Sequence, residues 1–359
     1  MMMRRLAGIM ACVTMLGAAA AGWLWFAASH DEVEQPPSAG EVRARATVPP
    51  PSAASPANPA LELVPTPIRV AGLESESREL PALRDVHVVP GSRGGAEALA
   101  FDGTSLWVAS QFHNTVARVR ASDGKTLETV PVGRQPVAVL ADPSGIWVAN
   151  LGDDTVTRLS PSDGSILGTF PVGHGPGGLV GSGNNIWVLN RNDSTVTKLS
   201  RDGVTLATYR VGTRPTGATW DGSNLWVANN MSDTVTKLDG ATGAVLGTFS
   251  VGKGPFGAAF DGANVWITNF FDGTVSKLRG SDGATLAVFP VGDGAAGITF
   301  DGVSIWVASN GVNRVTRLRP TDGAVLATYA TGAGPFGVTS DGAAVWVANF
   351  ATDSVSTSR

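Results

Sequence analysis

The sequence predicts an all-β protein, a seven-bladed β-propeller of four-stranded antiparallel blades. A tryptophan recurs every 39 or 40 residues, each period contains four short β-type runs, and Asp-Gly pairs separate many of these runs. A fixed period in this range indicates an array of similar supersecondary units. The repeated tryptophans are Trp107, Trp147, Trp187, Trp226, Trp266, Trp306 and Trp346.

Residues 251–290 illustrate the repeat. Its β-type runs are roughly residues 257–260, 264–268, 274–278 and 285–291, and they are rich in Val, Thr, Leu, Phe and Trp, which suit a packed sheet. Asp-Gly between apolar runs favours a hairpin, because glycine tolerates the positive φ of a tight turn. No stretch carries a sustained helical period. Four antiparallel strands in 40 residues are typical of a propeller blade.

The blade count and the closure of the ring follow from the period. Residues 80–359 make up 280 residues, or seven periods of 40. The last repeat ends after its third run, whereas residues 84–91 resemble residues 287–292, the fourth run of another repeat. We therefore expect an N-terminal strand to complete the last blade and remove the free sheet edge.

Residues 1–30 differ in kind from the repeats. Arg4 and Arg5 precede 24 uncharged residues, 6–29. An apolar run of this length can span a bilayer, and the arginines favour the cytoplasmic side. We predict an uncleaved membrane anchor with the propeller outside the cytoplasm. The alternative is a signal peptide cleaved near Ala27-Ala28-Ser29, which gives a secreted or periplasmic protein.

Residues 31–79 are rich in Pro, Ala and Ser, and we expect a disordered linker that holds the propeller away from the membrane. Residues 80–359 contain no cysteine, because the chain's single cysteine is Cys12, so ring closure must rest on strand pairing and packing. The net charge of −4 does not point to nucleic acid as a partner.

The loops of a propeller fall on two faces. In this sequence the loops of one face repeat from blade to blade, and those of the other face change. Turns between the first and second runs, and between the third and fourth, mostly repeat Asp-Gly, which we interpret as turn chemistry rather than a metal site. The loops between the second and third runs, and those that lead into each blade, change from repeat to repeat. We call the face that carries them the variable face. Loops on a rigid scaffold often carry function.

The variable face combines aromatic residues with Arg, Lys and His. This mixture suits an anionic or amphipathic partner, either a protein or an envelope polymer. The alternative is that these loops vary without function and that the phenylalanines plug the channel mouth. The candidate ligand-binding residues are Arg93, Phe112, His113, Arg134, His174, Arg191, Arg214, Lys253, Phe256, Phe270, Phe271, Arg314, Phe336 and Phe350.

Two further patterns have a structural interpretation. An Asn recurs at the end of the second run, and we expect it to hydrogen-bond loop backbone. We expect the acidic residues before the third run to cap loop amides rather than bind Ca²⁺; they are Asp153, Asp154, Asp193, Asp233, Asp272 and Asp353. No Ser-His-Asp pairing, metal-ligand cluster or phosphate loop is recognisable, so no catalytic residue, metal or cofactor is predicted.

Residues 146–150 (Ile-Trp-Val-Ala-Asn), 154–159 and 168–173 carry a family resemblance. The repeat resembles that of the YVTN-type β-propeller family and, more loosely, those of the NHL and streptogramin-lyase propellers. Trp replaces the tyrosine that usually opens the family's strand-two motif. The resemblance covers residues 80–359 and implies the propeller fold, whereas related propellers include surface proteins, binding modules and lyases.

The resemblance leaves several functions open. Streptogramin-lyase chemistry depends on histidine and Mg²⁺ in the later blades, and no histidine follows His174 in this chain. The first hypothesis is therefore an exported, membrane-tethered binding scaffold. The alternatives are a streptogramin-lyase-like metal-dependent lyase and a quinoprotein relative, the latter suggested by residues 240–243 (Gly-Ala-Thr-Gly).

Overall fold

The computed structural model describes residues 80–87 and 94–359. The predicted anchor (1–30), the predicted linker (31–79) and the candidate residue Arg93 lie outside the described residues. Within the described ranges, no helix is long and apolar enough to cross a membrane.

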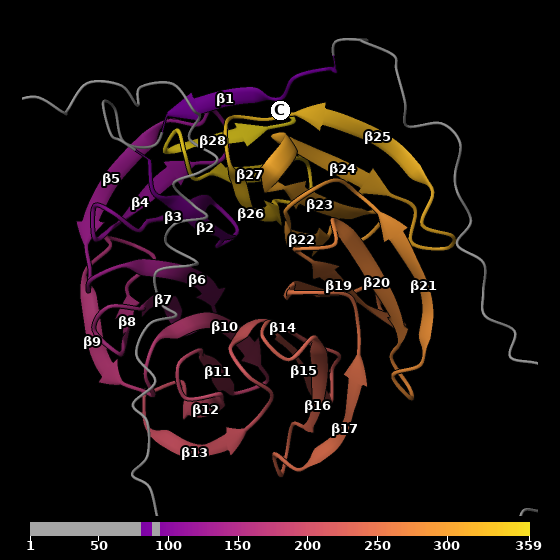
Figure 1. Cartoon of the computed structure of the whole chain (residues 1–359). Helices are drawn as coiled ribbons and strands as arrows, with labels where there is room; N and C mark the ends of the chain where they lie inside the picture. Colours follow the sequence, from indigo (N-terminus) through magenta and orange to yellow (C-terminus); the bar gives the residue numbers. More distant parts are fainter. Residues whose placement is uncertain (1–79, 88–93) are drawn as a thin grey trace, which may run out of the picture. The chain divides into compact units, whose positions relative to one another are not determined.

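Seven four-stranded antiparallel sheets stand around a ring, which Figure 1 shows end-on. Each sheet is one blade, and its first strand is innermost. The blades, from innermost to outermost strand, are: blade 1, β2 (Ala96–Phe101), β3 (Ser105–Ser110), β4 (Thr115–Arg120) and β5 (Thr126–Pro131); blade 2, β6 (Pro136–Asp142), β7 (Gly145–Asn150), β8 (Thr155–Leu159) and β9 (Ile166–Pro171); blade 3, β10 (Pro176–Ser182), β11 (Asn185–Asn190), β12 (Thr195–Ser200) and β13 (Thr205–Arg210); blade 4, β14 (Pro215–Trp220), β15 (Asn224–Asn229), β16 (Thr234–Asp239) and β17 (Val245–Ser250); blade 5, β18 (Pro255–Phe260), β19 (Asn264–Asn269), β20 (Thr274–Arg279) and β21 (Thr285–Pro290); blade 6, β22 (Ala295–Phe300), β23 (Ile305–Ser309), β24 (Arg314–Leu318) and β25 (Val325–Ala330); blade 7, β26 (Pro335–Ser340), β27 (Val345–Asn349), β28 (Ser354–Thr357) and β1 (Arg84–His87). A short 3₁₀ helix, η1 (Asn310–Val312), precedes β24. The predicted seven-bladed architecture is confirmed.

The ring closes through its N-terminal strand, as the repeat pattern predicts. β1 pairs antiparallel with β28, with Val86 opposite Val355. Just before β1, Leu83 N donates to Ala330 O at 3.0 Å, so the incoming chain also contacts the outer strand of blade 6. Figure 1 shows the indigo N-terminal strand beside the yellow C-terminal one. Strand pairing without a disulfide therefore joins the two ends of the described domain.

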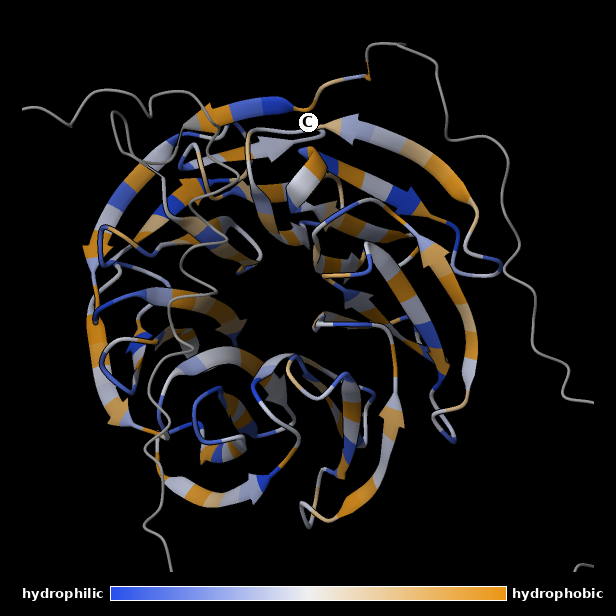
Figure 2. Cartoon of the chain, in the orientation of Figure 1, coloured by the Kyte–Doolittle hydropathy of each residue, from blue (hydrophilic) through white to orange (hydrophobic). Residues whose placement is uncertain are grey.

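The hydrophobic core lies between neighbouring blades. Trp107 of blade 1, for example, packs in one cluster with Ile146, Val148 and Leu159 of blade 2. Figure 2 shows that hydrophobic residues follow the strands, whereas many turns are hydrophilic. Burial between blades explains why the second strand of each repeat reads as a continuous apolar run.

The innermost strands approach one another closely at their third residue, and in several blades leave no room there for a Cβ. A Cβ on Gly217 would lie 2.2 Å from Phe256 O, and a Cβ on Gly297 would lie 2.1 Å from Phe336 O. Small residues therefore occupy this position in every blade: Ala98, Ala138, Gly178, Gly217, Gly257, Gly297 and Gly337. The preceding residue does not face this restriction, and its identity changes from blade to blade.

The repeated tryptophan joins three parts of the propeller. In blade 4, Trp226 Nε1 donates to Asp221 Oδ2 at 2.8 Å, and the same aspartate accepts two turn amides through Oδ1. The indole stacks on Phe249 of the outer strand, with ring centroids 5.6 Å apart. Lys237 Nζ lies 4.6 Å from the ring centroid and donates to Gly280 O of blade 5 at 2.9 Å. One indole thus connects a turn, an outer strand and the next blade.

The turn aspartate is therefore structural. Burial opposes the ionisation of Asp221, but the hydrogen bonds from Trp226, Asn224 and the turn amides outweigh it and hold the pKa of this carboxyl below its usual value. Blades 1, 5, 6 and 7 repeat the Asp–Trp bond, and Ser144 and Ser182 replace the aspartate in blades 2 and 3.

Asp221→Ala is expected to lower the free energy of unfolding by about 2–3 kcal/mol, because a buried indole N–H and two turn amides lose their acceptor. Urea unfolding of the full-length protein measures this change. The matched control is Asp322→Ala, an exposed turn aspartate on the same face that bonds Arg319 and the Ala324 amide. Equal destabilisation by both substitutions would contradict the role assigned to the indole bond.

Candidate functional site

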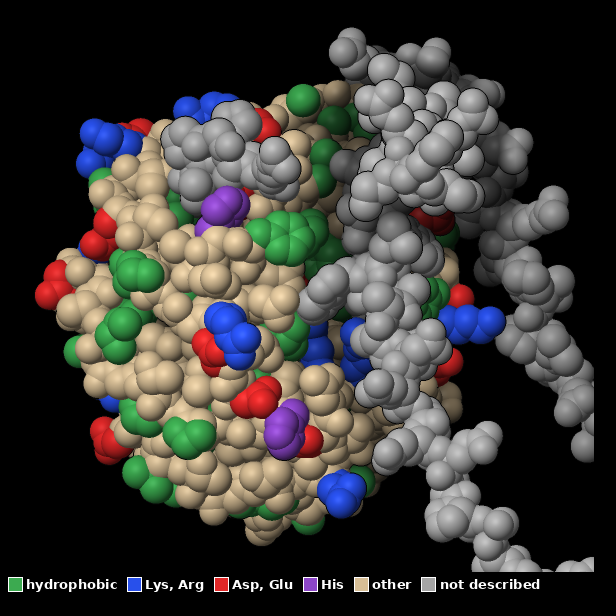
Figure 3. All heavy atoms as spheres, turned by 60° about the vertical axis from the view of Figure 1, so that its left-hand side comes forward, with side chains coloured by type: hydrophobic (Ala, Val, Ile, Leu, Met, Phe, Trp, Pro, Cys, Tyr) green, Lys and Arg blue, Asp and Glu red, His purple; other side chains and the backbone are tan. Residues whose placement is uncertain are grey.

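The loops between the second and third strands of a blade share one face with the loops between blades. Leu151 N donates to Gln135 O at 2.9 Å, and Phe270 N donates to Gly254 O at 2.9 Å, so each pair of loops is joined. Figure 3 shows basic, acidic, histidine and hydrophobic side chains on such a face, around a hollow near its middle. The loops that form the variable face are thus neighbours in the structure.

Five of the six acidic side chains cap loop amides as predicted, whereas Asp353 accepts from the Ser110 hydroxyl instead. Asp193 Oδ2 accepts from His174 N and Asp272 Oδ2 from Lys253 N, both at 2.7 Å. Asp154 and Asp233 cap further loop amides in the same way, at 2.7 and 2.8 Å. Within residues 80–87 and 94–359, no group of three or more His, Cys, Asp or Glu is placed to hold a metal ion.

The recurring asparagine has a different partner from the one expected. Asn150 Nδ2 donates to Thr155 Oγ1 at 3.1 Å and to Thr157 Oγ1 at 2.9 Å. The same donor–hydroxyl pattern recurs at Asn190, Asn229, Asn269 and Asn349. The prediction of a loop-backbone partner was wrong, because the third strand places its Thr or Ser hydroxyls directly beside the amide.

Six phenylalanine rings form a continuous chain on the variable face. They come from blades 1, 5 and 7 and, in order of contact, are Phe112, Phe350, Phe336, Phe256, Phe270 and Phe271, with successive centroid separations of 5.2, 6.0, 5.2, 5.9 and 5.5 Å. The two terminal rings, Phe112 and Phe271, are 55% and 45% exposed. We call these six residues the phenylalanine chain; it offers an apolar surface with two exposed ends.

Phe256 and Phe336 place this chain at the central channel. Both are the second residue of an innermost strand, β18 and β26, and their rings meet although blade 6 lies between them. The equivalent residue of blade 6 is Ala296, which is fully buried and leaves room for the contact. In blades 1 to 4 this position is held by Glu97, Val137, Gly177 and Thr216.

Charged side chains, rather than aromatic rings, line the channel in other blades. The Arg191 side chain lies over Gly177, where a Cβ would be 2.0 Å from Arg191 Nε, and its Nη2 donates to Gly177 O at 3.2 Å. Arg191 and Glu97 are only 8% and 9% exposed. Within the part of the chain that the structure describes, no hydrogen bond or ion pair joins these two side chains, and Arg191 Nε has no hydrogen-bond partner.

Electrostatics couple Glu97, Arg191 and Arg214, which we call the channel cluster. Burial raises the pKa of Glu97 to about 7, and the charge of Arg191 offsets this effect only in part. Burial lowers the pKa of Arg191; Glu97 opposes this shift and Arg214 adds to it. Burial also lowers the pKa of Arg214. The cluster therefore carries an excess of positive charge at neutral pH.

Arg214 is held in an uncommon backbone conformation. Its φ is 55°, and Gln135 of blade 2 has a φ of 53° at the equivalent position. The other five blades place glycine there: Gly95, Gly175, Gly254, Gly294 and Gly334. A non-glycine residue in the left-handed region costs about 1 kcal/mol or more, and such costs gather at functional sites. Blades 2 and 4 thus place a long polar side chain, Gln135 or Arg214, where the other blades have glycine.

The structure brings together a Ser, a His and an Asp that the sequence showed no sign of pairing. Ser110 Oγ lies 2.9 Å from His113 Nδ1 and 3.0 Å from Asp353 Oδ1, and Asp353 Oδ2 lies 3.4 Å from the same His113 nitrogen. A hydrolytic triad needs the serine and the aspartate on opposite ring nitrogens. Here both approach Nδ1, so this geometry joins blades 1 and 7 rather than forming a proton relay.

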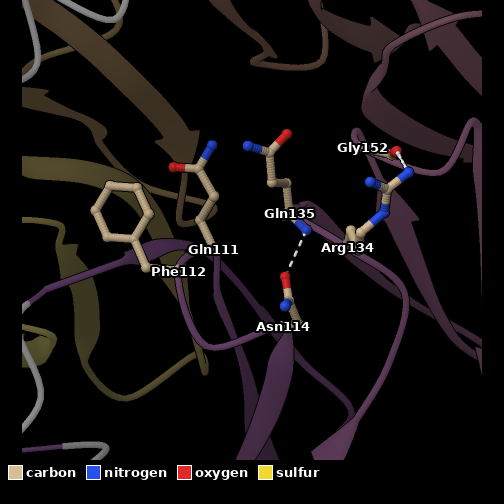
Figure 4. A pocket seen from close by; sticks show the side chains of 6 residues that line it. All are labelled: Gln111, Phe112, Asn114, Arg134, Gln135 and Gly152. Atoms are coloured by element: carbon tan, nitrogen blue, oxygen red, sulfur yellow. Dashed lines mark hydrogen bonds between the residues drawn. The ribbon is translucent and has the colours of Figure 1, made fainter.

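A hollow of about 380 Å³ lies between the loops of blades 1 and 2. Figure 4 shows Phe112 on one side of it and Arg134 on the other. Arg134 Nη2 donates to Gly152 O at 2.6 Å, and Gln135 N donates to Asn114 Oδ1 at 2.9 Å. The remaining lining residue is Gln111. This hollow pairs an aromatic ring with a cation at the rim of the variable face.

The remaining predicted residues lie apart from the channel cluster. His174 is exposed, and the hydrogen bond and charge of Asp193, with the charge of Asp154, raise its pKa. Lys253 is exposed in an inter-blade loop. Arg314 lies in β24 rather than in a loop, at the position where most blades have Thr. Arg93 lies outside the described residues.

Sequence reasoning missed Glu97. It lies in a strand, and its position is channel-lining only because the innermost strands face the axis. The available signal was the comparison of the seven repeats, since Glu97 is the charged member of a set that otherwise contains Val, Gly, Thr, Phe and Ala.

These observations define a seven-bladed β-propeller whose channel mouth has an aromatic side and a charged side. The solved structures that the chain resembles include streptogramin B lyase-like propellers of the same architecture. One is a streptogramin B lyase (19% identity, TM-score 0.67, 77% of this chain and 96% of that chain). Another is virginiamycin B lyase from Staphylococcus aureus (18% identity, TM-score 0.67, 77% and 98%).

Kuenenia stuttgartiensis hydrazine synthase is similar to the same extent (18% identity, TM-score 0.66, 76% of this chain and 98% of that chain). No protein-family model and no curated protein matches the chain. At these identities the likeness shows the fold alone, and the function has to be argued from the site.

Glu97→Gln is expected to stabilise the full-length protein at pH 8 by about 3 kcal/mol and to have little effect at pH 4.5. The folded-state pKa of about 7 lies above the ordinary value of 4.5, so the wild type loses stability as pH rises through this window. Urea unfolding at both pH values measures the difference. The control is Glu128→Gln, at a surface pair with Arg118. A pH-independent effect of Glu97→Gln would contradict the assignment.

Proposed function

We propose that the protein is an exported, membrane-tethered β-propeller that acts as a binding scaffold. Its partner would be an acidic, amphipathic protein or polymer of the cell envelope, bound through the variable face. Export and tethering rest on the sequence of residues 1–79: the apolar run after Arg4 and Arg5, and the Pro-rich linker that follows it.

The observation that carries the proposal is the phenylalanine chain beside the arginines of the same face. Aromatic and arginine side chains are enriched among residues that dominate binding energy at interfaces. Phe112 and Phe271 present apolar area at the two ends of the chain. Lys253 supplies an exposed basic group on the same face, as do Arg134 and His174, which are paired with Asp153 and Asp193. A partner with apolar groups and acidic groups matches both features.

The rigidity of the loops also supports a binding role. Asp193 and Asp272 hold the inter-blade loops through their backbone amides, so the face is ordered before a partner arrives. Preorganisation lowers the entropy cost of association and raises affinity for a given contact area.

A streptogramin-lyase-like, metal-dependent lyase is the second candidate, because two of the similar solved structures carry lyase names. Its test is direct. Full-length protein is incubated with a streptogramin B antibiotic and Mg²⁺, with and without EDTA, and ring opening is followed by mass spectrometry. EDTA-sensitive turnover would favour the lyase over the scaffold.

The scaffold proposal predicts that Phe112→Ala/Phe271→Ala reduces capture of the envelope partner at least about tenfold, because the exposed ends of the aromatic surface are lost. The full-length protein is immobilised, exposed to envelope extract of the same cells, and the bound component is quantified. The matched control is Leu167→Ala/Leu246→Ala, which removes equally exposed aliphatic side chains from the outer strands β9 and β17.

Lys253→Glu tests the acidic character of the partner and is expected to weaken capture without changing stability, since this side chain is exposed. Equal capture by the wild type and all variants would overturn the placement on the variable face. Capture of no component by the wild type would overturn the scaffold function itself.

A further inference from the structure

We propose that the channel mouth is a binding site for a small organic acid, with the carboxylate at Arg191 and the apolar part of the ligand against Phe256 and Phe336. The inference goes beyond the scaffold function, because a small ligand in the channel does not require a macromolecule at the rim. Four observations carry it.

The first observation is a buried donor without an acceptor. Arg191 is 8% exposed, and its Nε has no hydrogen-bond partner within the described chain. An unsatisfied buried donor costs about 1–3 kcal/mol, and more where the group is charged. The glycine at position 177 makes room for this guanidinium, and Gly177 O anchors its Nη2 at 3.2 Å. The side chain is thus anchored through Nη2, while its buried Nε has no acceptor.

The second observation is the unbalanced charge. Arg214 lies close enough to lower the pKa of Arg191, and among the described residues no hydrogen bond or ion pair joins the Glu97 carboxyl to Arg191. Burial also favours the neutral form of Glu97. Buried charges are normally paired, so the Arg191 guanidinium beside a partly neutral counter-group favours the entry of an anion. A carboxylate is the anion whose planar geometry matches a guanidinium.

The third observation places the apolar groups at the same level of the channel. Gly177, over which Arg191 lies, is the second residue of its innermost strand, as are Phe256, Phe336 and Glu97. Blade 7 adjoins blade 1 there, since a Cβ on Gly337 would lie 2.8 Å from Glu97 O. The guanidinium and the two rings therefore face one axis from different blades.

The fourth observation is the contact between the Phe256 and Phe336 rings, whose centroids are 5.2 Å apart. The small side chain of Ala296, in the blade between them, leaves room for this contact. Together the two rings form an apolar wall on one side of the mouth, and the channel cluster forms the charged side. Figure 3 shows basic and hydrophobic side chains together in the central hollow. A ligand with a carboxylate at one end and an aromatic or branched apolar group at the other fits this division.

Phenylacetate is a suitable probe, and phenylacetamide is its neutral counterpart of nearly equal shape. Isothermal titration of the full-length protein at pH 7.5 is expected to show phenylacetate binding at least about tenfold more tightly than phenylacetamide, a difference of about one charge-assisted hydrogen bond. Inorganic phosphate serves as a third probe, for an anion without an apolar part.

Two substitutions at the channel cluster are expected to act in opposite directions. Arg191→Met weakens phenylacetate binding at least about tenfold, because the charged donor is lost. Glu97→Gln tightens it, because a nearby negative charge that repels the bound carboxylate is removed. Arg279→Met, at an exposed arginine paired with Asp282, is the matched control and leaves binding unchanged.

Three results would overturn the inference. They are equal affinity for phenylacetate and phenylacetamide, absence of phenylacetate binding by the wild type, and weaker binding in Glu97→Gln. Arg191-dependent binding of phosphate in preference to phenylacetate would overturn the apolar half of the site. Loss of envelope capture with phenylacetate binding intact would overturn the scaffold function and leave this inference standing.

Discussion

Each repeat buries an indole whose N–H must find an acceptor, and the rest of the propeller depends on how that need is met. In blade 4, Asp221 accepts from Trp226 and from its own turn amides, while Lys237 lies by the ring and reaches a carbonyl of blade 5. The same aspartate therefore forms the turn, satisfies the core and fixes the position from which the next blade is held. The residues of the turns on this face can therefore change little from blade to blade, which explains why Asp-Gly recurs there.

The opposite face and the channel carry the differences between blades. The third residue of each innermost strand must be small, because neighbouring backbones approach to within reach of a Cβ. The second residue has no such limit, and there the ring places Glu97, Gly177, Phe256 and Phe336. The framework repeats strictly from blade to blade, but the residues at the channel mouth do not. The phenylalanine chain and the channel cluster are both products of this single variable position and the loops above it.

The period of the repeat predicted the blade number, the strands to within about two residues and the closing strand, because these depend on local patterns. The loops predicted Phe256, Phe336, Arg191 and Arg214 as candidates, but not which of them meet. Glu97 was missed because a strand residue does not reveal that it faces the axis. The contact of Ser110 with Asp353 joins residues 243 positions apart and has no local signal. Arg314 was expected in a loop but begins β24, at the position where Thr115 and Thr155 begin the third strands of blades 1 and 2.

The channel mouth contains two features that lower stability and that the fold does not require. Val137 and Ala296 show that the position of Glu97 accepts an apolar side chain, which would avoid the cost of burying a carboxyl. Five blades show that the position of Arg214 accepts glycine, which would avoid the left-handed strain. Both costs fall on the same charged cluster, in which Arg191 Nε also lacks an acceptor. A buried carboxyl and a strained arginine in one cluster, at positions where most blades have an apolar residue or glycine, indicate a site shaped for a ligand rather than for folding.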